Sequence, residues 1–130
     1  MIVDSSVIVA ILKNEDEAPH LETKMQDTEQ PLRISAANWL EASIVADGMH
    51  SAELSLRFDR IIERAGLEIV TVTAEQASIA RDTYRAYGKG SGHNAQLNFG
   101  DCFAYALAVT TGEPLLFKGN DFSETDIQVA

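Results

Sequence analysis

Four acidic residues stand where a charge could take part in chemistry: Asp4, Glu41, Asp101 and Asp121. Asp101 lies near the front of "LNFGDCFAYALA", a stretch that is otherwise almost wholly apolar. Two carboxylates brought to about 5 Å repel by roughly 3 kcal/mol at an effective dielectric of about 20, so such a cluster has no structural benefit. Carboxylate oxygens are, however, the ligands that Mg²⁺ and Mn²⁺ prefer, and one or two such ions support phosphoryl chemistry.

Each acid also has a purely structural explanation. Asn98 can cap a helix, which places Asp101 at the third helical position, where its charge suits the positive end of the helix dipole. Asp121 can serve in an Asn-Asp turn, and Glu41 can be a solvated helix residue. Asp4 is the hardest to explain in this way, because a charge at the end of an apolar strand needs a partner. Both interpretations of Asp101 remain open at this point.

The elements that must position these acids alternate between strand and helix. Strands are expected at 1–4, 32–35, 67–72 and 114–117, with a possible short fifth strand at 127–129. Helices are expected at about 6–13, 19–27, 37–47, 52–65 and 74–87, and onward from Asn98. In the helix at 37–47, Leu40, Ile44 and Val45 are expected on one apolar side. Strands this apolar have no wet face, so the pattern predicts an α/β sandwich around a parallel sheet.

Such a sheet explains how distant acids could meet. Functional groups of a parallel sheet gather at the carboxyl ends of its strands. Asp4 ends the first strand, Glu41 lies in the helix after the second, and Asp121 follows the fourth. Asp101 begins the helix that leads into the fourth strand. The four acids are therefore predicted to converge on one edge of the sheet.

Length and composition limit the remaining possibilities. The chain has 130 residues, of which 45% are hydrophobic and 23% charged, which fits a single globular domain over residues 1–130. Its net charge of -10 argues against nucleic-acid binding through bulk electrostatics, so such a role needs bound divalent cations or a local basic patch. The candidates for that patch, most of them expected to be solvated helix residues, are Arg57, Arg60, Arg64, Arg81, Arg85 and Lys89.

The amino-terminal sequence predicts a cytoplasmic protein, and the single cysteine predicts no disulfide. Cys102 is the only cysteine, so it cannot form an internal disulfide, and a small buried role is expected for it. The amino terminus lacks a basic leader and a cleavage site. The apolar run from Val7 to Leu12 is far shorter than the roughly 20 residues that span a bilayer. We therefore expect no membrane contact.

Serine residues and a glycine-rich loop give weaker signals. Ser5 and Ser6 lack the G-x-S-x-G elbow of a nucleophile, and Ser6 is interpreted as a helix cap or a hydrogen-bond partner of Asp4. The loop "GKGSGHNAQ" is neither a P-loop nor a dinucleotide fingerprint. As a mobile loop at the rim of the site, it could bring Lys89 and His93 to phosphate.

Aromatic residues and one further lysine complete the candidates. Trp39, Phe99 and Tyr105 could stack on bases, but core packing is expected for all three. Lys118, which follows the fourth strand, is a further possible contact for RNA phosphate.

Four stretches of the chain resemble a known family. The stretches "MIVDSSVIVAIL", "ISAANWLEASIV", "YGKGSGHNAQLNFGDCFAYALA" and "PLLFKGNDF" are similar to successive signatures of PIN domains of the VapC type, the ribonuclease toxins of bacterial toxin-antitoxin pairs. The resemblance implies a three-layer α/β/α sandwich around a mostly parallel sheet of about five strands, commonly dimeric. It also implies that Asp4, Glu41 and Asp101 hold the metal and that Asp121 is the fourth catalytic acid.

The resemblance assigns supporting roles as well. Ser6 matches the family's hydroxyl residue beside the first aspartate, and Asn98 matches the polar residue ahead of the third. Related toxins tend to carry Arg or Lys near the loop histidine, where this chain has Ser91 and Gly92, so the loop's share of RNA binding is in question.

The implied activity is an Mg²⁺- or Mn²⁺-dependent endoribonuclease that leaves 5′-phosphate and 3′-hydroxyl ends. The implied partners are RNA, a second copy of the chain, and a VapB-like antitoxin that inserts a basic residue into the acidic site. Two alternatives exist. A phosphoacceptor domain needs an aspartate ending the third strand, and "EIVTVT" has none. A catalytically silent PIN-like module that only engages an antitoxin remains the alternative, although the presence of all four acids argues against it.

Overall fold

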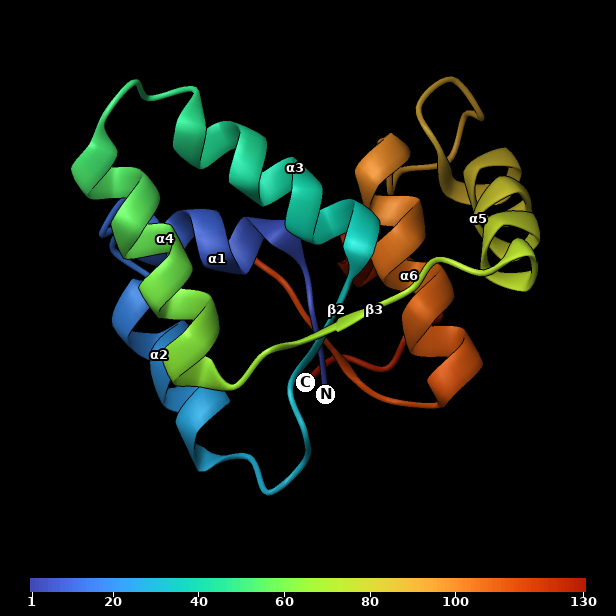
Figure 1. Ribbon diagram of the computed structural model, residues 1–130. Coiled ribbons are helices and arrows are strands. Elements are labelled where there is room, and N and C mark those ends of the chain that lie inside the picture. Colours follow the sequence, from blue (N-terminus) through green and yellow to red (C-terminus); the bar gives the residue numbers. More distant parts are fainter.

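The computed structural model describes residues 1–130 as a four-stranded parallel sheet between two sets of helices (Figure 1). The strands are β1 (Ile2–Val3), β2 (Arg33–Ser35), β3 (Glu68–Val70) and β4 (Leu115–Leu116). The helices are α1 (Ser5–Leu12), α2 (Ala18–Asp27), α3 (Ala36–Asp47), α4 (Ala52–Ala65), α5 (Ala74–Tyr87) and α6 (Phe99–Thr111), and a 3-10 turn, η1 (Asp121–Glu124), follows β4. The order across the sheet is β3-β2-β1-β4, and every pairing is parallel.

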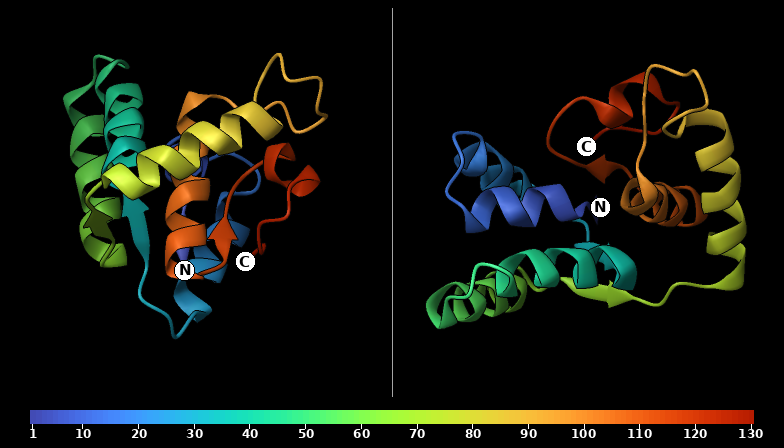
Figure 2. Two further views of the ribbon diagram at one scale, coloured as in Figure 1. Left: turned by 90° about the vertical axis from the view of Figure 1, so that its right-hand side faces the viewer. Right: turned by 90° about the horizontal axis from the view of Figure 1, so that it is seen from above.

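Each face of the sheet has its own apolar core, because neighbouring strand residues point to opposite faces. Val3 and Leu116 pack with residues of α1 to α4, whereas Ile2 and Leu115 pack with residues of α5 and α6. Figure 2 shows α5 and α6 on the far side of the sheet from α1 and α2. The three-layer α/β/α sandwich is therefore confirmed.

The sheet has fewer and shorter strands than expected. The predicted fifth strand at 127–129 is a single bridge between Leu115 and Val129, held by backbone hydrogen bonds from Leu115 to Gln128 and from Ala130 to Leu115. The turn η1 lies directly before this segment and its residues bond within the turn, so only the last residues reach β4.

The apolar side predicted for α3, formed by Leu40, Ile44 and Val45, does not supply the buried residues of this helix. Leu40 and Ile44 are 52% and 62% exposed, and the buried residues of this helix are Asn38, Ala42 and Ala46. Helix α3 lies against both α1 and α6. Such close helix approach favours small side chains at the contact, so the large apolar residues face outward.

Most predicted helix starts are confirmed. Ser51, Thr73 and Asn98 cap α4, α5 and α6, each accepting a hydrogen bond from a backbone N–H in the first turn. Helix α4 ends at Gly66, whose φ of 60° is the left-handed conformation that glycine adopts freely. The cap of α1 is Asp4 rather than Ser6.

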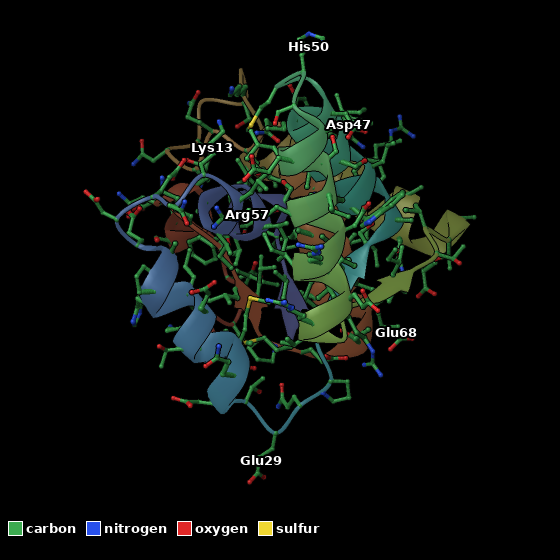
Figure 3. The ribbon with its side chains drawn as sticks, turned by 60° about the vertical axis from the view of Figure 1, so that its left-hand side comes forward. Lys13, Glu29, Asp47, His50, Arg57 and Glu68 are labelled. Atoms are coloured by element: carbon green, nitrogen blue, oxygen red, sulfur yellow. The ribbon has the colours of Figure 1, made fainter.

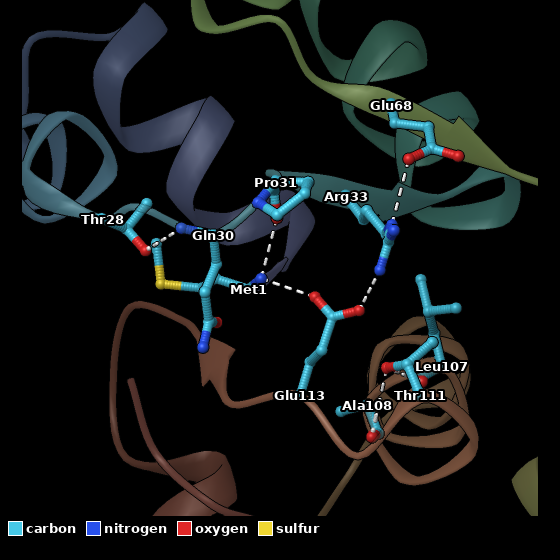
Figure 4. Close-up of polar contacts among 10 residues, drawn as sticks. All are labelled: Met1, Thr28, Gln30, Pro31, Arg33, Glu68, Leu107, Ala108, Thr111 and Glu113. Atoms are coloured by element: carbon cyan, nitrogen blue, oxygen red, sulfur yellow. Dashed lines mark hydrogen bonds and ion pairs between the residues drawn. The ribbon is translucent and has the colours of Figure 1, made fainter.

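An ion-pair network ties the amino ends of the strands together (Figure 4). Glu113, in the turn before β4, accepts a hydrogen bond from the amino group of Met1 at 2.6 Å and also pairs with Arg33 of β2. Arg33 Nε donates to Glu68 of β3 at 3.0 Å. The acids discussed below lie at the opposite edge, which this network leaves open. None of the six helices combines the length and the apolar character needed to cross a membrane.

Candidate active site

Asp4 lies at the carboxyl end of β1, where it caps α1. Its Oδ2 accepts a hydrogen bond from the backbone N–H of Ser6 at 2.9 Å. Its Oδ1 is buried without any hydrogen-bond partner, and only 2% of the residue is exposed. Burial raises the pKa of Asp4, and the negative charge of Glu41 raises it further. An unpartnered carboxylate oxygen at this depth is costly, so it calls for a ligand.

Glu41 reaches the same place from α3. The hydroxyl of Ser5 donates a hydrogen bond to Glu41 Oε2 at 2.6 Å. Gly100 of α6 lies so close to this carboxylate that a Cβ there would stand 2.5 Å from Oε1. Residues from α1, α3 and α6 therefore meet around Glu41, at the edge where these helices lie together in Figure 1.

Asp101 is the third residue of α6, as predicted, and takes part in a capping box. Its Oδ2 accepts from the backbone N–H of Asn98 at 2.8 Å, and its own N–H donates to Asn98 Oδ1 at 2.9 Å. The pKa of Asp101 is raised to about 7, chiefly by burial and then by the negative charges of Asp4, Asp121 and Glu41. Asp101 is thus a helix-start residue and also the centre of an acidic cluster.

Asp121 stands apart from the other three acids in its exposure. It opens η1 directly after the turn that follows β4, and its side chain is exposed. Its charge still acts on Asp101. The structure therefore places three acids in the interior of the site and the fourth at the rim.

The acidic cluster offers a divalent cation oxygen ligands without competing cations. No cationic side chain forms an ion pair with any of the four acids. The donor set is oxygen only, and Asp4 Oδ1 lacks a partner, which suits a hard cation such as Mg²⁺ or Mn²⁺. In the conformation described, no three side chains converge closely enough to hold an ion. Each inner carboxylate is turned to a local donor instead, and mutual repulsion favours that separation.

Ser6 and Lys118 connect the site to β4. The hydroxyl of Ser6 accepts a hydrogen bond from the backbone N–H of Lys118 at 3.0 Å, and its backbone N–H is the partner of Asp4. Of the two interpretations of Ser6, the partner of Asp4 is confirmed and the helix cap is wrong. The ammonium of Lys118 pairs with Glu15 and, at 3.4 Å, with Glu17. Contact between Lys118 and RNA stays a prediction, and it would compete with these ion pairs.

The glycine-rich loop holds Lys89 and His93 differently. Lys89 is exposed. The ring of His93 packs edge-on against Tyr87 with centroids 4.9 Å apart, and its Nδ1 accepts from the backbone N–H of Ala95 at 3.1 Å. The His93 ring is therefore held within the loop, and the contact of Lys89 and His93 with RNA phosphate stays a prediction.

Two of the three aromatic residues pack in the core as expected. Tyr105 is buried and donates to Asp126 at 2.6 Å, and Trp39 packs partly buried against the core. Phe99 is 76% exposed, so the expectation of core packing is wrong for it. Gly100 and Asp101 take the inward positions at the start of α6, which leaves Phe99 outside with its ring edge-on to Phe103 at 4.9 Å.

Two residues of the site, Asn38 and Gly100, are not among those predicted from the sequence. Asn38 is fully buried and its Nδ2 donates to the backbone oxygen of Gly100 at 2.9 Å, while its Oδ1 has no partner. Signals for both exist in the sequence. Asn38 is an amide in a mostly apolar helix one turn before Glu41, and Gly100 is a glycine inside a helix directly before Asp101.

A groove lies away from the acids, between the end of α1, α2 and α4. Its volume is about 700 Å³. Apolar residues and three arginines of α4 share its lining, including Met25, Leu32, Leu56, Ile61, Arg57, Arg60 and Arg64. Arg57 lies between α4 and α1 (Figure 3) and donates to the backbone oxygen of Ile11 at 3.2 Å. Arg60 and Arg64 are exposed and form no ion pair. Glu22 and Glu53 also line the groove, so its charged lining consists of three arginines and two glutamates.

Solved structures share this fold. Residues 1–130 are similar to VapC20 of Mycobacterium tuberculosis, described as a sarcin-ricin loop cleaving toxin, with a TM-score of 0.77 and 14% identity over 99% of this chain and 97% of that one. They are also similar to a chain of VapBC2 from Rickettsia felis bound to a promoter DNA fragment, with a TM-score of 0.73 and 17% identity over 98% and 94% of the two chains. At these identities the likeness shows the fold.

Sequence relatives are much closer. The chain is 47% identical to Ribonuclease VapC28 of Mycobacterium tuberculosis over 130 residues, which is 100% of this chain and 97% of that protein. It is 45% identical to Ribonuclease VapC42 of the same organism, over 100% and 98% of the two chains. The family model "PIN domain" matches residues 1–128. The chain therefore belongs to the VapC ribonuclease family of PIN-domain proteins.

Proposed function

We propose that this protein is a metal-dependent endoribonuclease and the toxin of a toxin-antitoxin pair. The observation that carries the proposal is the buried, unpartnered Oδ1 of Asp4 beside the charges of Glu41 and Asp101. Full-length relatives named as VapC ribonucleases support the same activity. The alternative is a silent module that only engages an antitoxin.

In the proposed reaction, Asp4, Glu41 and Asp101 would hold Mg²⁺ or Mn²⁺. A bound ion supplies an acidified water and a positive charge that stabilises the phosphate and the leaving oxygen, which gives 5′-phosphate and 3′-hydroxyl ends. Ser5 and Asn98 orient the carboxylates of Glu41 and Asp101 through the hydrogen bonds described above. Asp121, exposed at the rim, is available to orient water or substrate, and Lys89 is available to bind RNA phosphate.

The acidic site also suggests how an antitoxin would inhibit the enzyme. Four acids without a cationic partner favour a segment that inserts Arg or Lys, because charge-assisted hydrogen bonds to carboxylates are strong. The groove between α2 and α4 presents Arg60 and Arg64, which are exposed and form no ion pair, beside apolar residues. We propose that it binds an apolar segment of the antitoxin whose acidic residues pair with these two arginines. One antitoxin could then occupy both places. We also propose that the protein forms a homodimer, which light scattering would detect as twice the mass of one chain.

The deciding experiment follows cleavage of labelled RNA. We expect activity to vanish with excess chelator and to return with Mg²⁺ or Mn²⁺. Asp4→Asn is the matched inactive variant, and Asp59→Asn, an exposed residue of α4, is the control for the loss of one charge. Unchanged cleavage in excess chelator would refute the metal-dependent mechanism. Absence of cleavage under all conditions, with tight antitoxin binding, would favour the silent module.

A further inference from the structure

Gly100 is a glycine at a position where the backbone does not require one. It is the second residue of α6 and lies outside the left-handed conformation that favours glycine, so its backbone would accept an alanine. A Cβ at this position would stand 2.5 Å from Glu41 Oε1 and 2.7 Å from Oε2. The atoms that exclude a side chain at Gly100 are therefore the carboxylate oxygens of Glu41.

Asn38 prevents α6 from moving away from that carboxylate. Its Nδ2 donates to the backbone oxygen of Gly100 at 2.9 Å, and the amide is fully buried. Asn38 and Glu41 lie one turn apart on α3, so they share a face of that helix. The hydrogen bond thus fixes the spacing between the backbone of Gly100 and the helix that carries Glu41.

Ser5 restrains the same carboxylate from α1. Its hydroxyl donates to Glu41 Oε2 at 2.6 Å. Glu41 is therefore held by a hydrogen bond from Ser5 and by close contact with Gly100, while Asn38 keeps the two helices together. Asp101 follows Gly100 directly, so the contact also sets where Glu41 lies relative to Asp101.

From these contacts we infer that Gly100 and Asn38 are positioning residues that fix the Glu41 carboxylate beside Asp101. Neither residue is expected to touch the metal or the RNA. The consequence for metal binding rests on the proposed function, whereas the position of the carboxylate does not.

The test uses Gly100→Ala. The obstructing atoms are the end of a flexible side chain, so the variant should fold, with the methyl group displacing the Glu41 carboxylate. In crystal structures of the metal-free wild type and variant, we expect a displaced carboxylate and loss of the Ser5–Glu41 hydrogen bond. A carboxylate that stays in place, with α3 and α6 moved apart instead, would overturn the inference. This comparison decides the inference even if the wild type proves to bind no metal, a result that would refute only the proposed function.

A second measurement connects position with metal binding. In thermal melts, we expect Gly100→Ala to lose most of the Mn²⁺-induced rise in Tm that the wild type shows, while its metal-free Tm stays close to that of wild type. Glu41→Asp shortens the side chain by one methylene, which makes room for the added methyl group. The double variant should therefore regain part of the Mn²⁺-induced rise that Gly100→Ala lost, although Glu41→Asp alone weakens it.

Gly48→Ala is the matched control, because Gly48 is a right-handed glycine at the end of α3, away from the acids. Its Mn²⁺-induced rise should equal that of wild type. An undiminished rise in Gly100→Ala, or a double variant in which the two losses simply add, would overturn the inference.

Discussion

Asn98 and Asp101 hold each other through two reciprocal hydrogen bonds of 2.8 and 2.9 Å, and the pKa of Asp101 is at the same time raised by the charges of Asp4, Asp121 and Glu41. Capping uses Asp101 Oδ2 only. The same residue therefore satisfies the helix end and contributes charge to the cluster. The two explanations of Asp101 are compatible, and only their relative energies remain to be measured.

The stability of Asp101→Asn compares the contribution of the helix cap with the cost of the charge in the acidic cluster. An asparagine oxygen can still accept from Asn98, so the cap should lose at most about 1 kcal/mol. The neutral amide removes the cost of burying a charge and the repulsion from the other acids. This should raise the free energy of unfolding by about 1–3 kcal/mol. We expect a net rise of a few °C in the metal-free Tm, a reduced response to Mn²⁺, and loss of cleavage.

Melts in chelator and then in millimolar Mn²⁺ check this expectation, with Asp59→Asn as the control for net charge. A metal-free Asp101→Asn that is less stable than wild type, with a full response to Mn²⁺, would reduce Asp101 to a helix-start residue.

Stability without metal should fall as pH rises from about 5 to 8. The pKa of Asp101 is raised to about 7 from 3.8, so between these values the folded state binds more protons than the unfolded state. Stability then decreases with rising pH, and the loss is complete above the folded pKa. The raised pKa of Asp4 acts in the same direction.

Urea unfolding at several pH values in chelator measures this slope. Asp101→Asn should flatten it, because the titrating group is gone. A metal-free wild type that is equally stable at pH 5 and pH 8 would contradict the prediction.

The acidic cluster should also govern antitoxin binding. If the cognate antitoxin inserts Arg or Lys, the double variant Glu41→Gln, Asp101→Asn should weaken binding by roughly tenfold or more at low salt, as loss of charged hydrogen bonds implies. Isothermal titration with the antitoxin gives the Kd. Binding as tight as that of wild type would mean that the basic insertion does not occur.

The sequence predicts features that depend on neighbouring residues. Asn98 is identifiable as a cap because a cap bonds to the N–H groups two or three positions later. The edge on which the acids gather follows from strand direction in a parallel sheet. The prediction that the four acids gather at this edge therefore does not depend on the conformations of their side chains.

Features that depend on distant pairing were missed. The hydrogen bond between Asn38 and Gly100 joins residues 62 positions apart, so the sequence signals of the two residues do not show that they meet. Leu40 and Ile44 have helical spacing, but the contact of α3 with its neighbours selects Ala42 and Ala46. Periodicity alone did not identify which side of α3 is buried.

The arginine groove provides the last prediction. Arg60 and Arg64 are exposed, unpaired and one turn apart on α4, beside apolar residues of the groove. If an acidic and apolar antitoxin segment binds there, Arg60→Glu, Arg64→Glu replaces attraction by repulsion. The Kd should rise by roughly tenfold or more at low salt, and added salt should reduce the difference, because exposed charges are screened within about 10 Å at 0.1 M.

The matched control is the double variant Arg81→Glu, Arg85→Glu. It changes the net charge by the same amount as the α4 double variant, but both residues lie on α5. Because long-range repulsion would affect both double variants alike, a greater loss for the α4 pair identifies the groove as the binding surface. Thermal melts of both variants establish that each is folded. Equal losses for the two pairs would show that only net charge matters, and the groove would then have to be rejected as the antitoxin site.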